Sequence, residues 1–187
     1  FDPRSVELAL ALVSRWGERA PQALDATRTR AAVLEAPGVL RFRDRPLPEP
    51  AVGEVRLRVL STGVCGTDVH LWKGTLGAPL PLVLGHETVG VVEARGEGVT
   101  LPLGARVGVP WAQASCGACA HCTTGHARQC LRLWTWVELG GGYALHARAV
   151  ASACVLVPGS LTSEEAAPLM CAGHTIETAL VRASVRA

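Results

Sequence analysis

Residues 54–62 read EVRLRVLST, the clearest strand pattern in the chain. Apolar Val55, Leu57 and Val59 alternate with two arginines, which is the two-residue period of a strand with one buried face. Further short apolar runs, with glycine or proline at their edges, predict strands at residues 89–94, 105–109 and 149–157. Several short strands separated by turn signals favour a β-barrel or β-sandwich over a doubly wound sheet.

Helical patterns occupy the two ends of the chain. Residues 1–28 are predicted to be helical, because a capping aspartate and a proline in the first turn precede apolar residues at helical spacing. Thr162 and Glu165 have the spacing of a capping box, the reciprocal side-chain cap at a helix start. Pro168 is expected to break or kink the helix at that point, and residues 176–185 are expected to form the last helix.

The composition is that of a globular protein that acts on small molecules. The formal net charge is +2, and no basic stripe indicates a nucleic-acid partner. No run approaches the ~18 apolar residues of a membrane helix. The apolar run 6–13 contains Glu7 and lacks the positive cluster of a secretory signal, so we expect a cytoplasmic protein without a membrane or nucleic-acid partner. A start at Phe1 rather than Met suggests a piece of a longer protein.

Four of the seven cysteines are bunched with the spacing C-x2-C-x2-C-x7-C, at Cys116, Cys119, Cys122 and Cys130. Two-residue gaps allow consecutive thiolates to converge on one ion, and four thiolates close a tetrahedral zinc shell with no position for substrate. Such a site is structural, because it holds together a loop with little core of its own. Two disulfides or an iron–sulfur cluster are the alternatives. The odd cysteine count and the regular spacing favour a metal in a reducing cytoplasm.

Three further elements carry residue types that bind metals. Residues 65–70 read CGTDVH, residues 85–87 read GHE, and residues 171–175 read CAGHT. Each element is weak by itself, because a lone cysteine or histidine is more often a buried core residue than a ligand. Together they offer two thiolates and one imidazole, a Cys2His set that leaves one position on a zinc ion open.

From about residue 29 to its end, the chain resembles the catalytic half of the zinc-dependent, medium-chain alcohol dehydrogenases. The resemblance rests on these three elements, on the four-cysteine cluster, and on the stretches GGYA at 141–144 and EAAPLMCAG at 165–173. It implies a mainly β fold, a GroES-like, partly open β-barrel with a zinc-binding lobe and peripheral helices. It also implies two zinc ions per chain.

The resemblance assigns a role to each ligand-type residue. Cys65, His86 and Cys171 would hold a catalytic zinc, and the four-cysteine cluster would hold a structural one. The catalytic zinc would act as a Lewis acid that favours a bound alkoxide, from which hydride passes to a nicotinamide. Glu87 would approach the metal transiently and help exchange water. Asp68 would accept the free N–H of His86 and fix its tautomer.

The resemblance also assigns residues to the reaction path. Thr67 would hydrogen-bond the substrate oxygen, His70 would relay its proton towards solvent, and Thr175 would face the nicotinamide ring. Two positions depart from the family pattern. Gly66 stands where some relatives have a cationic residue for the cofactor pyrophosphate, and His174 stands where a small or apolar residue is expected.

The function implied is that of a zinc-binding catalytic domain of an NAD(P)-dependent alcohol or aldehyde oxidoreductase with a small-molecule substrate. The expected division is a helical extension at 1–28, a catalytic domain at 29–160 with a zinc lobe at 111–134, and helices leading to a cofactor domain at 161–187. No Gly-x-Gly-x-x-Gly follows a strand, so the Rossmann domain for NAD or NADP is expected to be absent and the chain alone inactive. Any homo-oligomer would form through that absent domain.

Two alternative functions remain open. In polyol-oxidising relatives a glutamate takes the place of the cysteine ligand, so Glu87 in place of Cys171 would indicate a polyol or 3-hydroxy amino acid dehydrogenase. A zinc-stabilised barrel without catalysis would be a binding module, although the open ligand set argues against it. The glycines at 140–142 lack the flanking strand and helix of a phosphate loop and predict a turn before a strand. Cys154 lies in an apolar run and is predicted to be a small buried residue.

Overall fold

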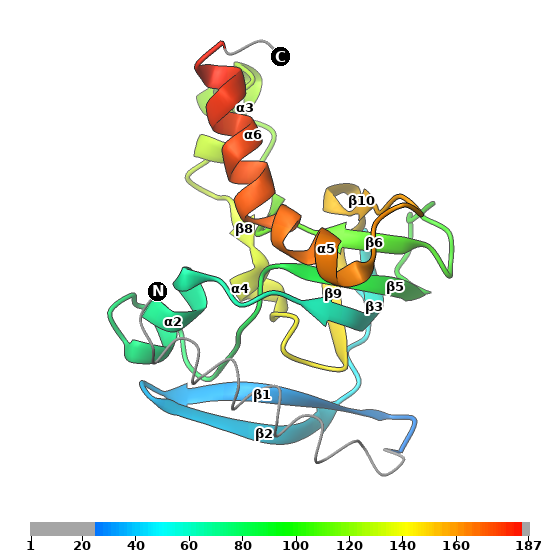
Figure 1. Ribbon diagram of the computed structural model, residues 1–187. Coiled ribbons are helices and arrows are strands. Elements are labelled where there is room, and N and C mark those ends of the chain that lie inside the picture. Colours follow the sequence, from blue (N-terminus) through cyan, green and yellow to red (C-terminus); the bar gives the residue numbers. More distant parts are fainter. Residues whose placement is uncertain (1–24, 185–187) are drawn as a thin grey trace.

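The computed structural model describes residues 25–184, which are mainly β-strand with short helices around the sheets (Figure 1). The strands are β1 (Arg28–Ala36), β2 (Val39–Pro46), β3 (Glu54–Thr62), β4 (Leu82–Val83), β5 (Thr88–Arg95), β6 (Arg106–Val109), β7 (Ala112–Ala114), β8 (Trp134–Thr135), β9 (His146–Val150) and β10 (Val155–Leu156). The α-helices are α2 (Gly66–Lys73), α3 (Ala120–Thr123), α4 (Trp136–Leu139), α5 (Ser163–Ala166) and α6 (Ala172–Arg182). The 3-10 helices are η1 (Ala127–Gln129), η2 (Ala151–Ala153) and η3 (Ala167–Met170).

Strand β3 is an inner strand of a five-stranded antiparallel sheet with the order β10-β6-β5-β3-β9. The predicted alternation holds at its start, where Val55 and Leu57 are fully buried and Arg58 is exposed. It weakens after Val59, because an irregularity between Val59 and Ser61 shifts the register with β5. Val55 and Leu57 pack against apolar residues of β5, β6 and β9, and this cluster is the core of the sheet.

Residues 143–145 join the two larger sheets into a partly open barrel. The second sheet has the order β2-β1-β4, and Ala32 in β1 donates its backbone N–H to the Tyr143 carbonyl at 2.7 Å. Leu145 donates to the Arg30 carbonyl in β1 at 2.9 Å, and its own carbonyl accepts from Val59 in β3 at 2.9 Å. One segment therefore pairs with a strand of each sheet, while β2 and β10 remain edge strands. The predicted fold class is confirmed.

Two predicted elements differ from the structure. The run 149–157 is not one strand, since β9 ends at Val150, η2 follows, and β10 pairs with β6 at the opposite edge of the sheet. Apolar content alone does not reveal the corner between them. The last helix begins at Ala172 rather than Ile176. Pro168 lies in the first turn of η3, where no helical hydrogen bond needs its missing N–H. The break in the helical path that it causes therefore ends before α6 begins.

The remaining helix predictions, at 1–28 and at Thr162, lie partly within the described residues. Thr162 caps α5 as predicted, because its Oγ1 accepts from the Glu165 N–H at 3.2 Å and the Glu165 carboxylate accepts from the Thr162 N–H at 2.9 Å. The helical prediction for 1–28 lies outside the described residues up to residue 24. Residues 26 and 27 form a turn, and Arg28 already belongs to β1. No helix in residues 25–184 is both long enough and apolar enough to cross a membrane.

His146 on β9 gives the fold a pH dependence that can be tested. Its Nδ1 lies 3.0 Å from Thr29 Oγ1, and its Nε2 lies 3.3 Å from Glu93 Oε2. Burial lowers its pKa below the ordinary value of 6.5, and the Arg56 and Arg58 charges act in the same direction against Glu93. The neutral ring is therefore favoured in the folded chain. The neutral ring therefore contributes fully to folding stability at a pH above the pKa that His146 has in the unfolded chain. This stability is lost as the pH falls below that pKa.

We expect the free energy of unfolding of the wild type to fall, relative to that of His146→Asn, as the pH is lowered from 8 to about 5. Denaturant unfolding of both proteins at several pH values measures this difference. The comparison with the variant removes the contributions of all other titrating groups. A difference that stays constant over this range would contradict the assignment.

Candidate metal centres

The four clustered cysteines lie in a lobe whose base is the two-stranded sheet of β7 and β8. The sulfur atoms are 3.8 Å apart for Cys116 and Cys122, 3.5 Å for Cys119 and Cys122, and 3.8 Å for Cys119 and Cys130. Four sulfurs held at ~2.3 Å from one zinc are separated by about 3.8 Å. The cluster therefore has the dimensions of a single tetrahedral metal–thiolate site.

The disulfide alternative is wrong, because all seven cysteines are free. Backbone N–H groups of Ala118 and Cys119 lower the pKa of Cys116 to about 5. The Cys122 N–H favours the Cys119 thiolate, but burial and the neighbouring sulfurs outweigh it and raise the pKa of Cys119 to about 11. Sulfurs this close compete for one negative charge. A bound cation would remove that competition, so the donor set fits a metal ion.

The second donor set comes from three distant parts of the chain. The ligand atoms of Cys65, His86, Glu87 and Cys171 all lie within 4.8 Å of one another. Cys65 precedes α2, His86 and Glu87 lie in the turn before β5, and Cys171 lies between η3 and α6. The two thiol sulfurs are 3.9 Å apart, a separation that suits two ligands of one zinc. The fold thus brings all three predicted ligands together with Glu87.

Asp68 is fully buried behind this donor set. Its carboxylate accepts the N–H of Cys65 at 3.0 Å and the N–H of Gly85 at 3.1 Å. It also faces His86 Nδ1, which lies 3.4 Å from Asp68 Oδ1. Gly85 has a φ of 94°, in the left-handed region that favours glycine, and so lets its N–H turn towards the carboxylate. One side chain therefore holds the backbone beside two of the ligands, Cys65 and His86, and also faces the His86 ring.

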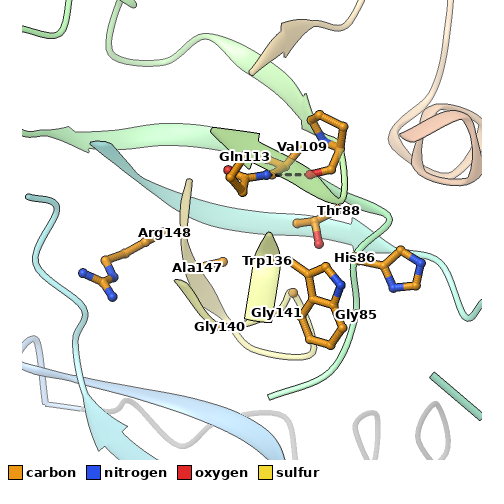
Figure 2. A pocket seen from close by; sticks show the side chains of 12 residues that line it. Gly85, His86, Thr88, Val109, Gln113, Trp136, Gly140, Gly141, Ala147 and Arg148 are labelled. Atoms are coloured by element: carbon orange, nitrogen blue, oxygen red, sulfur yellow. Dashed lines mark hydrogen bonds between the residues drawn. The ribbon is translucent and has the colours of Figure 1, made fainter. Parts of the chain in front are cut away.

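The His86 ring is buried against Trp136, with the ring centroids 5.6 Å apart and nearly parallel (Figure 2). With Nδ1 towards Asp68, Nε2 is the nitrogen left for the two thiols. Burial opposes a charge on the ring, but Asp68 and Cys65 outweigh it and raise the pKa of His86 to about 11. The interaction between the Cys65 thiol and the His86 ring also lowers the pKa of Cys65. A metal would take the place of the proton that this thiol and imidazole share.

The hollow beside His86 is small, about 10 Å³, which is room for one water-sized sphere. The glycine segment at 140–142 borders it, with Gly140 and Gly141 beside the Trp136 ring (Figure 2). The Gly142 N–H donates to the Gly85 carbonyl at 2.7 Å. These glycines connect α4 to β9 with a bend at Gly142, and their backbone pairs with residues 83–85 instead of closing a turn. They steady the backbone next to His86.

Glu87 is buried beside the ligands, with 5% of its surface exposed. Burial is the main cause that raises the pKa of its carboxyl group. Gly63 leaves the space for it, because a Cβ atom at position 63 would collide with the Glu87 carboxylate. Sequence reasoning missed Gly63, since only the close approach of β3 to this turn makes its small size necessary.

The residues predicted for the reaction path lie on two helices next to the donor set. On α2, Thr67 Oγ1 lies 3.8 Å from Cys65 Sγ, and exposed His70 has its Nδ1 3.0 Å from Thr75 Oγ1. On α6, Thr175 is exposed and donates its N–H to the Cys171 carbonyl at 2.9 Å. Cys154 is half-buried rather than fully buried, and burial raises the pKa of its thiol to about 12.

His174 points to a residue that the sequence did not single out. Its Nδ1 lies 3.4 Å from Nη2 of Arg128, in the four-cysteine lobe. Burial and the Arg128 charge lower the pKa of His174, which keeps the ring neutral. Nothing in the sequence separates Arg128 from the other arginines, because its partner is 46 positions away.

Comparison with known proteins identifies the family to which the fold belongs. Residues 51–159 match the family described as the alcohol dehydrogenase GroES-like domain. An alcohol dehydrogenase of Geobacillus stearothermophilus is 42% identical over 156 residues, which cover 81% of this chain and 46% of that protein. An alcohol dehydrogenase of Schizosaccharomyces pombe is 39% identical over 153 residues, covering 80% of this chain and 44% of that protein. The chain spans about half the length of these relatives.

A solved structure with the same fold is the cobalt- and zinc-bound thermostable alcohol dehydrogenase of Pyrobaculum aerophilum. It has a TM-score of 0.76 and 33% sequence identity, over 84% of this chain and 49% of that one. Acetophenone reductase of Geotrichum candidum, solved in complex with NAD, has a TM-score of 0.77 and 29% identity, over 88% of this chain and 50% of that one. With the family match extending over most of the barrel, the chain belongs to the alcohol dehydrogenase family that shares the GroES-like domain.

Proposed function

We propose that this chain is the zinc-binding catalytic domain of an oxidoreductase that interconverts small alcohols and aldehydes or ketones with NAD or NADP. The observation that carries the proposal is the convergence of Cys65, His86 and Cys171, with buried Asp68 behind them. The names of relatives at 37–42% identity support the reaction class. The complex of a structural neighbour with NAD supports the cofactor class.

Cys65, His86 and Cys171 would hold the catalytic zinc, and the four-cysteine lobe would hold the structural one. When bound, zinc supplies a Lewis acid that favours the deprotonated form of a substrate hydroxyl. Asp68, whose Oδ1 lies 3.4 Å from His86 Nδ1, would hold the ring in the tautomer that presents Nε2 to the metal. Glu87, whose carboxylate belongs to the same donor set, would approach the metal during ligand exchange.

Thr67 and His70 would move the substrate proton. They are three residues apart on α2 and so share one side of the helix. The Thr67 hydroxyl, 3.8 Å from Cys65 Sγ, lies where it can hydrogen-bond a substrate oxygen. His70 is exposed, so it can pass a proton to solvent, and Thr75 orients its ring at 3.0 Å. Thr175, at the start of α6, would face the nicotinamide.

Metal analysis tests the ligand assignment. We expect two zinc ions per wild-type chain and one in Cys65→Ser, because the serine variant keeps the four-cysteine lobe intact. Cys154→Ser is the matched control, since Cys154 belongs to neither donor set and should leave both ions bound. Absence of zinc from the wild type, or an unchanged zinc content in Cys65→Ser, would overturn the proposal.

A second candidate reaction, oxidation of a polyol or 3-hydroxy amino acid, is favoured by one observation. The Glu87 carboxylate lies in the same donor set as Cys171. If Glu87 is the third ligand, Cys171→Ser will keep the catalytic ion and Glu87→Gln will lose it. If Cys171 is the third ligand, as we propose, the two variants will behave in the opposite way.

Turnover separates the enzyme from a non-catalytic binding module. The sequence contains no Gly-x-Gly-x-x-Gly fingerprint, so we propose that these residues bind metal without hydride transfer by themselves. An assay with NAD and NADP should therefore show no turnover for this chain. A protein that joins it to a dinucleotide-binding domain should be active. Inactivity of that longer protein with both zinc ions bound would favour the binding module.

A further inference from the structure

Cys171 is carried by a helix that has little packing of its own. It lies directly before α6, and no residue of α6 is buried. Its sulfur must nevertheless stay 3.9 Å from Cys65 Sγ to share a metal ion with it. Because Cys171 is the N-cap residue of α6, a tilt of the helix would displace this ligand. A contact from outside the helix can fix its direction.

Arg128 makes that contact from the four-cysteine lobe. It lies in η1, two residues before Cys130, which is a buried member of the cluster. Its Nη1 donates to Thr178 Oγ1, and its Nη2 lies 3.4 Å from His174 Nδ1. Among residues 25–184, these are the side-chain hydrogen bonds that join α6 to a distant segment.

His174 and Thr178 form a single receptor for the guanidinium group. They are four residues apart on α6 and so lie one above the other on the same face. The Thr178 hydroxyl donates to the His174 carbonyl at 2.8 Å, which leaves its oxygen free to accept from Arg128. The planar fork of arginine can reach both acceptors at once, whereas lysine offers only a compact point charge. Figure 1 shows α6 rising beside α3 of the lobe.

We propose that Arg128 is a positioning residue that couples the four-cysteine lobe to Cys171 and thereby raises metal affinity at the Cys65/His86/Cys171 site. The inference rests on the proposed function of both metal sites. It gives His174 a role, as the acceptor one helical turn beyond Cys171, that the pattern of the family does not supply. It also gives the four-cysteine lobe a role beyond stabilising its own loop, because the folded lobe sets the direction of α6, which follows the catalytic ligand Cys171.

Cobalt(II) binding tests the proposal without relying on catalysis. The chain is stripped of metal and titrated with Co2+, and the thiolate-to-cobalt absorption reports both sites. We expect Arg128→Gln and Arg128→Lys to weaken binding at the Cys65/His86/Cys171 site by about tenfold or more, as the loss of a supporting contact does at other metal sites. Binding at the four-cysteine cluster should be unchanged. Arg182→Gln, which removes the same charge from exposed α6, is the matched control and should bind as the wild type does.

A second variant covers the case in which Arg128→Gln disrupts the lobe itself. His174→Ala/Thr178→Val leaves every residue of the lobe in place and should weaken the same site to a similar extent. Combined with Arg128→Gln it should have no further effect, because both changes remove one interaction. Wild-type affinity in this double variant would overturn the inference while leaving the proposed function standing. A wild type that binds no Co2+ at Cys65, His86 and Cys171 would instead overturn the proposed function.

Discussion

Cys130→Ser is expected to remove one zinc ion per chain and to unfold the four-cysteine lobe. Three sulfurs remain, but the cluster loses its buried member, whose sulfur also accepts the N–H groups of Cys116 and Arg132 at 3.5 and 3.4 Å. Structural zinc contributes about 10–16 kcal/mol of apparent binding energy in small domains, and a lobe without a core has little else to hold it. The effect on the fold should therefore be larger than that of any single change at the second site.

The effect is measured by zinc content, by limited proteolysis and by denaturant unfolding. We expect new cleavage between β7 and β8, with the five-stranded sheet still protected, since its core is formed by separate residues. The coupling through Arg128 adds that affinity at the second metal site should fall as well. Cys154→Ser is again the control, because it exchanges a thiol for a hydroxyl away from both clusters. An uncleaved lobe with full zinc content would show that the cluster is not a structural metal site.

Asp68→Asn is expected to damage the second site without touching any metal ligand. The amide offers one acceptor oxygen and an NH2 group where two backbone N–H groups now meet a carboxylate, so the Cys65 or the Gly85 N–H loses its partner. An unsatisfied buried donor costs about 1–3 kcal/mol. His86 also loses the carboxylate beside its Nδ1, which should lower metal affinity about 10–100-fold.

Metal titration and denaturant unfolding of Asp68→Asn measure the two effects separately. Asp44→Asn is the matched control, because it makes the same chemical change in an exposed ion pair with Arg30. That pair lies in solvent and should matter little to either measurement. If Asp68→Asn binds metal as the wild type does, Asp68 has no part in holding His86.

The parts of the protein that could be predicted from sequence are those in which the interacting residues are neighbours in the chain. The four cysteines lie within fifteen positions, so their spacing alone indicates a shared ion. The start of β3 and the capping box at Thr162 follow from patterns a few residues long. The corner at η2 and the early start of α6 could not be predicted, because they depend on where the sheet and η3 direct the chain.

The second donor set could not be predicted from local spacing, because its residues are far apart in the chain. Cys65 and Cys171 are 106 positions apart, and only the resemblance to a family linked them before the structure placed their sulfurs 3.9 Å from each other. Neither a sequence pattern nor the family resemblance indicated the contact of Arg128 with His174. The amino-acid sequence by itself therefore determined the start of β3, the cap of α5 and the spacing of the four-cysteine cluster, because the residues involved are neighbours in the chain. Only the tertiary structure decided which distant side chains meet around His86 and which arginine holds α6, because those contacts form where packed sheets bring separate segments together.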